Sequence, residues 1–124
     1  MNDAGQTNPT YEFFPSTGTP INSPILEATL PVNLYPLTWL VPSGKLLIQS
    51  NWKTVLLDYN ANVEEPLDNI PDAVRTYPAS AGTAMLPLTP GNNWTATILF
   101  CGGTDQTSDG CVVAYIHVFS IAYV

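Results

Sequence analysis

Basic residues are scarce in this sequence, and charged residues of either sign are few. Only 10% of the 124 residues are charged, and three Lys or Arg against ten Asp or Glu give a net charge of −7. A basic cluster that could neutralise phosphate groups or an anionic membrane surface is therefore lacking. We expect neither nucleic acid nor a membrane as a partner.

Cysteine and histidine are also rare, which limits the metal and redox sites that the chain can build. Cys101 and Cys111 are too few for a disulfide scaffold and lack the repeated spacing of a zinc site, and they form either one bridge or none. The single histidine, His117, lies in the apolar run 112–119. There we interpret it as a core residue and not as a metal ligand.

Long uninterrupted segments are missing as well, because twelve prolines and eight glycines are spread along the chain. They leave short runs that suit strands and rarely suit helices of ordinary length. Apolar residues make up 45% of the chain, too many for a disordered segment of such low charge. The composition therefore predicts one all-β domain.

Three apolar runs in the first half predict a meander of strands. Residues 37–41 and 46–49 flank Pro42-Ser43-Gly44-Lys45, whose Pro and Gly suit a tight hairpin turn. The run 53–59 ends in Asn60-Ala61-Asn62, whose asparagines tolerate left-handed turn conformations. A brief edge strand is also expected at residues 11–15.

A similar pattern recurs after a polar loop predicted at residues 64–68. Residues 82–86 and 95–100 form a second predicted hairpin around Pro90-Gly91. Gly91 follows Gly44 by 47 residues, close to the roughly 50-residue period of kelch-type propeller blades. This favours a partial kelch-like β-propeller of about two blades, and a single small β-sandwich is the alternative.

Four longer stretches resemble a known family. They match, in one collinear register from Asn8 to Gly103, the N-terminal propeller domain of basidiomycete glyoxal oxidases, and runs of this length are more specific than a short motif. The stretches are Asn8–Pro15, Leu34–Leu40, Tyr77–Leu88 and Ile98–Gly103.

The resemblance implies a fungal copper radical oxidase with a seven-bladed, kelch-like propeller. Such enzymes hold one copper ion near the propeller axis and form a radical on a tyrosine cross-linked to a cysteine. They oxidise small aldehydes to carboxylic acids and reduce O₂ to hydrogen peroxide. They are secreted, and their peroxide serves extracellular peroxidases that attack lignin.

The chain lacks the residues that would bind this copper. The family uses two histidines, two tyrosines and the cross-linking cysteine, whereas this sequence has one histidine, no Tyr-His dipeptide and no segment similar to Arg-Trp-Tyr. We therefore expect no catalytic, cofactor-binding or metal-binding residue here, and copper only in intact family members. The chain is interpreted as a fragment that needs missing blades and is inactive alone.

Other candidates for chemistry receive structural interpretations. Tyr77 is expected in the core or at a blade edge, and Cys101 is expected to be buried beside Gly102 rather than joined to Tyr77 or Tyr59. Five acidic residues are expected in a solvated loop, without a partner that would make an acid/base pair. They are Asp58, Glu64, Glu65, Asp68 and Asp72.

Asn93-Trp94-Thr95 is an N-glycosylation sequon on the second predicted hairpin, so Asn93 is a candidate modification site. A different class of function also remains open. A small all-β binding or structural module without redox activity would use aromatic and polar loops, and Trp52 and Trp94 are the residues that such a surface would offer.

The two ends of the chain suggest a boundary at residue 110. Residues 1–110 are assigned to the partial propeller domain, and the apolar segment 111–124 is expected to be atypical of the family. The tail is too short to span a bilayer as a helix, and residues 1–6 do not form a signal peptide. By the resemblance, the sequence starts inside the family's domain and stops before its copper ligands, which suggests a truncated or mis-spliced gene model. If the chain is made, its exposed strand edges and apolar tail are expected to invite aggregation.

Overall fold

The computed structural model describes residues 8–30, 33, 35–70, 74–75, 81–107, 110–114 and 118–123. Every strand pairing in this part of the chain is antiparallel, and helix is limited to two short segments, α1 (Pro24–Ala28) and the 3₁₀ helix η1 (Pro90–Asn92). The predicted all-β class is therefore confirmed. The strands are β1 (Thr10–Tyr11), β2 (Ile21–Asn22), β3 (Leu37–Leu40), β4 (Leu46–Ser50), β5 (Lys53–Asp58), β6 (Val63–Pro66), β7 (Ala81–Met85), β8 (Ala96–Gly102), β9 (Thr104–Thr107), β10 (Gly110–Ala114) and β11 (Val118–Tyr123).

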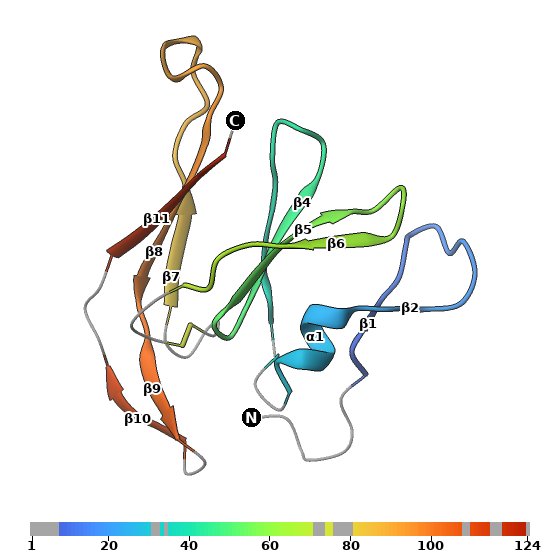
Figure 1. The fold of residues 1–124 in the computed structure, drawn as a ribbon, viewed down its shortest axis with the longest axis horizontal. Helices are drawn as coiled ribbons and strands as arrows, with labels where there is room; N and C mark the ends of the chain where they lie inside the picture. The colour runs from blue at the N-terminus through green and yellow to red at the C-terminus, as the bar shows by residue number, and fades with distance from the viewer. Residues whose placement is uncertain are drawn as a thin grey trace.

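A four-stranded meander forms the centre of the molecule (Figure 1). Its order is β3-β4-β5-β6, so each strand pairs with its neighbours in the sequence. The connections suit tight reversals, because Gly44, Asn51 and Asn62 have φ of 82°, 57° and 56°, in the left-handed region that Gly and Asn tolerate best. The predicted hairpin and the third strand beside it are confirmed.

The second predicted hairpin is also present, as β7 and β8. These strands belong to a three-stranded sheet of order β11-β8-β7, in which β11 pairs with β8 from Val118 opposite Cys101 to Tyr123 opposite Ala96. β8 ends at Gly102, where Gly102 and Gly103 have φ of 80° and 136°. In the sequence, β9 and β10 lie between β8 and β11, and they form a separate hairpin at one end of the molecule (Figure 1).

The two larger sheets share one hydrophobic core. Leu47 of β4 packs in the same cluster as Ile98 and Phe100 of β8, and all three side chains are fully buried. Trp39 meets Phe100 edge to face, with ring centroids 5.3 Å apart. Two antiparallel sheets that share a core are consistent with neighbouring blades of a partial propeller, and this packing by itself also fits the β-sandwich alternative.

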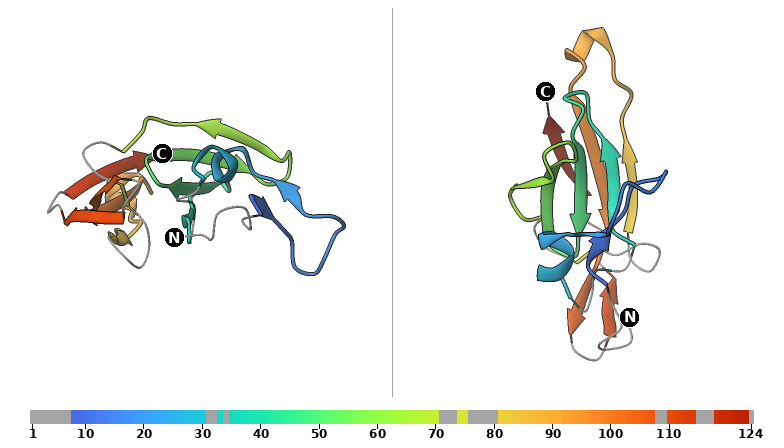
Figure 2. Two further views of the ribbon diagram at one scale, coloured as in Figure 1. Left: turned by 90° about the horizontal axis from the view of Figure 1, so that it is seen from below. Right: turned by 90° about the vertical axis from the view of Figure 1, so that its right-hand side faces the viewer.

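The opposite face of the four-stranded sheet is covered by the N-terminal segment. Ile25 of α1 packs against Ile48, Val55 and Leu57 in a second cluster, and Tyr11 of β1 lies at its margin. Figure 1 shows β7, β8 and β11 on one side of the meander and α1, β1 and β2 on the other, and the right-hand view of Figure 2 shows these groups one behind another. A brief N-terminal strand is present, but at Thr10–Tyr11; the expected bounds of 11–15 are wrong, because residues 12–15 are not part of a strand. The helix α1 was not predicted.

The polar loop predicted at residues 64–68 is wrong in part, because Val63–Pro66 forms the edge strand β6. An edge strand tolerates Pro66, since one side of its backbone needs no strand partner. The chain then returns towards the β4–β5 turn, where the amide of Ile70 donates to the carbonyl of Trp52 at 2.9 Å. No helix in the described ranges is long and apolar enough to cross a membrane.

Candidate functional site

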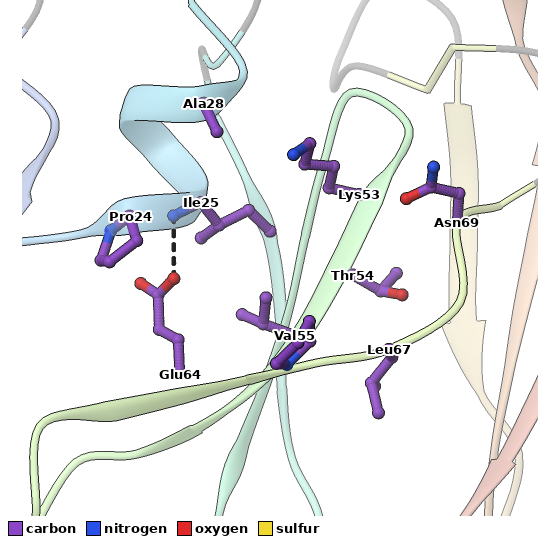
Figure 3. A pocket seen from close by; sticks show the side chains of 10 residues that line it. Pro24, Ile25, Ala28, Lys53, Thr54, Val55, Glu64, Leu67 and Asn69 are labelled. Carbon is purple, nitrogen blue, oxygen red and sulfur yellow. Dashed lines mark hydrogen bonds between the residues drawn. The ribbon is translucent and has the colours of Figure 1, made fainter.

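A cavity of about 350 Å³ lies between α1 and the β5–β6 edge of the four-stranded sheet (Figure 3). Its wall is mostly apolar, with one carboxylate and one amine among the lining side chains. The lining residues are Pro24, Ile25, Ala28, Lys53, Thr54, Val55, Glu64, Pro66, Leu67 and Asn69.

The carboxylate of this cavity, Glu64, is fully engaged in holding α1. One oxygen accepts the backbone amide of Ile25 at 2.8 Å, and the other accepts the hydroxyl of Ser23 at 2.6 Å. Ser23 is the residue before the helix, yet its side chain makes no cap of its own, so Glu64 from the neighbouring strand supplies the acceptor. With both oxygens bonded, Glu64 holds the start of α1 against β6 and is not placed to act as a general base.

A second cavity, of about 310 Å³, lies on the same face, beside β1. Tyr11 and Tyr59 both line it, and the Tyr11 hydroxyl donates to Oδ1 of Asn62 at 3.0 Å. Partial burial, and after it the negative charge of Glu64, raises the pKa of Tyr11 above its ordinary value of 10.0. Tyr11 is thus engaged as a hydrogen-bond donor to Asn62, and no other metal-ligating side chain among the described residues is grouped with it.

The remaining predicted acidic residues are dispersed over turns and an exposed edge. Asp58 Oδ1 accepts the amides of Asn60 and Ala61 at 3.0 and 3.1 Å and so shapes the β5–β6 turn. Glu65 forms an exposed ion pair with Lys45 at 2.7 Å. The solvated loop expected for these acids is wrong for Glu64, whose partners come from α1 and the residue before it.

Cys101 was expected to be buried, and this prediction is wrong because the residue is exposed and its thiol is free. The alternation of β8 explains the exposure, since Ala96, Ile98 and Phe100 face the core and Cys101 has the opposite parity. Tyr59 packs against the cluster on the α1 face of the other sheet. The structure therefore does not bring Cys101 and Tyr59 together, and Tyr77, Asp72 and His117 lie outside the described residues.

A copper ion would need several imidazole, phenolate or thiolate donors around one point. In the ranges that the structure describes, no group of three His, Cys, Asp or Glu side chains could hold a metal. Cys101 stands alone on its strand, and Tyr11 is a neutral donor to Asn62. The described residues therefore do not fit a copper centre.

The sequence analysis did not identify a buried polar group that links β4 and the β4–β5 turn to the segment at residues 74–75. Gln49 of β4 is fully buried, and its Nε2 donates to the carbonyls of Asn51 at 2.6 Å and Arg75 at 3.3 Å. Arg75 itself is 1% exposed and pairs with Asn51 in an isolated β-bridge. A Gln at an inward position of an otherwise apolar strand was the signal that could have pointed to this group.

Trp52 and Trp94 do not form a joint surface. Trp52 lies in the β4–β5 turn and Trp94 in the β7–β8 connection, and both side chains are exposed. Figure 1 shows these two connections at opposite ends of the sheets. The geometry gives no specific support to a binding module that would use the two tryptophans together.

The class of protein is thus an all-β chain whose two blade-like sheets pack face to face. The family model described as "Glyoxal oxidase N-terminus" matches residues 4–116, and the chain belongs to this family. Its curated relatives include Aldehyde oxidase GLOX1 of Arabidopsis thaliana, which is 38% identical over an 84-residue alignment that covers 60% of this chain and 13% of the relative. Aldehyde oxidase GLOX of Vitis pseudoreticulata is 41% identical over a 75-residue alignment that covers 57% of this chain and 14% of the relative.

This chain therefore spans a small part of the length of the curated relatives that it matches. Both of these relatives are plant proteins, whereas the sequence stretches suggested a fungal one. No solved structure matches the chain.

Proposed function

We propose that this chain forms about two blades of the propeller of a copper-dependent aldehyde oxidase of the glyoxal oxidase type. The family match over residues 4–116 carries this proposal. The two similar plant proteins are named aldehyde oxidases, which supports small aldehydes as substrates and O₂ as the electron acceptor of the whole enzyme. The blades would then be kelch-like, within a propeller of seven.

In this proposal the blades are scaffold, and the copper ligands belong to other parts of the enzyme. The described donor side chains are dispersed or engaged, as Glu64 and Tyr11 show. Since propeller blades bury their faces against neighbouring blades, this chain needs further blades for full stability. We accordingly expect the 124-residue chain to be inactive by itself.

The test measures hydrogen peroxide released from glyoxal and O₂ by two proteins, each supplied with copper. One is the 124-residue chain, and the other is the same chain extended by the remaining sequence of the aldehyde oxidase relative from Vitis pseudoreticulata. We expect peroxide from the extended protein and none above background from the short chain. Peroxide from the short chain would contradict the scaffold role, and an extended protein that binds copper and stays inactive would contradict the family assignment of activity.

Fungal origin, secretion and the boundary at residue 110 also belong to this proposal. Relatives of this family act outside the cell, which supports an extracellular location for the whole enzyme. Sequencing of the transcript across the codons for Gly103 to Cys111 tests whether residues 111–124 are a continuation of the domain. A continuous exon there would show that residues 111–124 continue the domain, and it would contradict the proposed boundary at residue 110.

A further inference from the structure

The β7–β8 connection contains two adjacent asparagines with different roles. Asn92 closes a capping box, in which its Oδ1 accepts the amide of Thr89 at 3.1 Å and its own amide donates to the Thr89 hydroxyl at 3.3 Å. Its Nδ2 also donates to the carbonyls of Pro87 and Thr95, both at 3.4 Å. The Asn92 side chain is therefore part of the structure of the loop.

Asn93 contributes to the same loop through its backbone only. Its amide donates to the carbonyl of Pro90 at 3.1 Å, and its φ of 54° places it in the left-handed region that asparagine tolerates. The side chain is exposed, and none of the hydrogen bonds in the described part of the chain engages it. Its carboxamide is thus accessible in the folded protein without loss of any interaction.

The loop that presents Asn93 is nevertheless well defined. The amide of Trp94 donates to the carbonyl of Thr89 at 2.9 Å, and the amide of Thr95 donates to the carbonyl of Asn92 at 3.0 Å. Thr95 directly precedes β8. A group attached at Asn93 would therefore be carried by an exposed position of a hydrogen-bonded hairpin loop.

We propose that Asn93 carries an N-linked glycan that covers the exposed apolar surface at this end of the hairpin. Trp94, the next residue, is 53% exposed, so a sugar at Asn93 would lie beside an aromatic side chain that water otherwise contacts. Asn93-Trp94-Thr95 is the single sequon of the chain, because Pro9 disqualifies Asn8-Pro9-Thr10.

The chemistry requires a lipid-linked oligosaccharide and the transferase of a eukaryotic secretory pathway. Nδ2 of Asn93 forms a bond to C1 of the first sugar, and the bond from C1 to the lipid pyrophosphate breaks with its electron pair on the phosphate oxygen. One amide proton is lost to solvent. The inference rests on the proposed secretion of the protein, and not on aldehyde oxidation.

The experiment is peptide mapping of the full chain after secretion from a eukaryotic host that adds N-glycans. The peptide that contains Asn93 is treated with an N-glycanase in ¹⁸O water, which converts a glycosylated Asn to labelled Asp. We expect the label at Asn93 in the wild type and in Thr95→Ser, and no label in Asn93→Gln and Thr95→Ala. An unlabelled Asn93 in secreted wild-type protein would overturn the proposal.

Asn92→Ala is the matched control, since it changes the neighbouring asparagine and leaves the sequon intact. We expect it to keep the glycan and to lower Tm, whereas Asn93→Gln and Thr95→Ala lose the glycan. Peroxide release is not a readout here, so failure of the proposed activity leaves these outcomes unchanged.

Discussion

Glu64 is a charged residue on an edge strand, yet its carboxylate joins elements that are far apart in the sequence. It binds the amide of Ile25 and the hydroxyl of Ser23, at sequence separations of 39 and 41 residues. Hydrogen bonds to a charged group contribute more than neutral ones, typically about 1.5 to 3 kcal/mol each. These contacts could not be predicted from the sequence, since neither donor lies near Glu64 along the chain.

Replacement of Glu64 by Ala is expected to lower the free energy of unfolding by about 1 to 3 kcal/mol, because the Ile25 amide and the Ser23 hydroxyl lose their acceptor. Urea unfolding followed by circular dichroism measures this change. Glu65→Ala is the matched control, because Glu65 has only the exposed ion pair with Lys45, worth about 0 to 1 kcal/mol. Equal decreases in the free energy of unfolding for the two variants would contradict a stabilising role of the Glu64 hydrogen bonds.

Tyr11 predicts a pH dependence of stability in the alkaline range. Its folded-state pKa is raised above 10.0, so the folded chain holds this proton more tightly than the unfolded chain does. The stabilisation is complete below pH 10, and it is lost as pH rises through the higher folded-state pKa. We expect the wild type to lose more stability than Tyr11→Phe above pH 10.

Absorbance of the phenolate near 295 nm during an alkaline titration measures the ionisation directly. Wild type minus Tyr11→Phe isolates Tyr11 from the other tyrosines of the chain. A difference curve centred at or below pH 10.0 would contradict the raised pKa.

At the scale of elements, strand β8 divides its side chains between two environments. Ile98 is fully buried in the core shared by the two sheets, whereas its neighbour Leu99 is only partly buried. Ile98→Ala is expected to cost about 2 to 5 kcal/mol, since it removes buried methyl groups and leaves a cavity. Leu99→Ala, its control on the other face of the same strand, should cost clearly less in the same denaturant titration.

The strands that could be predicted from the sequence are those marked by a local pattern of residues. Residues 37–41, 46–49 and 53–59 carry apolar runs closed by Gly or Asn turns, and the structure has β3, β4 and β5 there. β6 was missed because Glu64, Glu65 and Pro66 have the composition of a loop, and only pairing with β5 makes them a strand. α1 has five residues, too few for a helical period to be recognised.

The candidate sites also divide into those with a local sequence signal and those that depend on distant partners. The sequon at Asn93 was readable because it is a contiguous motif, and the exposure of Cys101 followed from strand parity, which the sequence analysis did not apply. The hydrogen bonds from Ser23 and Ile25 to Glu64, and the bond from Gln49 to the Arg75 carbonyl, join residues more than 20 positions apart. No local pattern encodes such partners.

At the scale of the whole molecule, the shared core predicts that the two larger sheets unfold together. Trp39 belongs to the four-stranded sheet and contacts Phe100 of the other, so its fluorescence reports on the interface. In a Trp52→Phe, Trp94→Phe background, we expect the fluorescence and circular dichroism transitions in urea to coincide. Two separate midpoints would show that the sheets are independent units.

The strand order has a consequence for the rate at which the chain folds. β3, β4, β5 and β6 pair only with sequence neighbours across short turns, and such local contacts form early, since little chain entropy is lost in closing each loop. β11 is different, because it pairs with β8 only after the β9–β10 hairpin has been passed. During synthesis the meander can therefore assemble while later strands are still being made, and β8 keeps one unpaired edge until the last of them arrives.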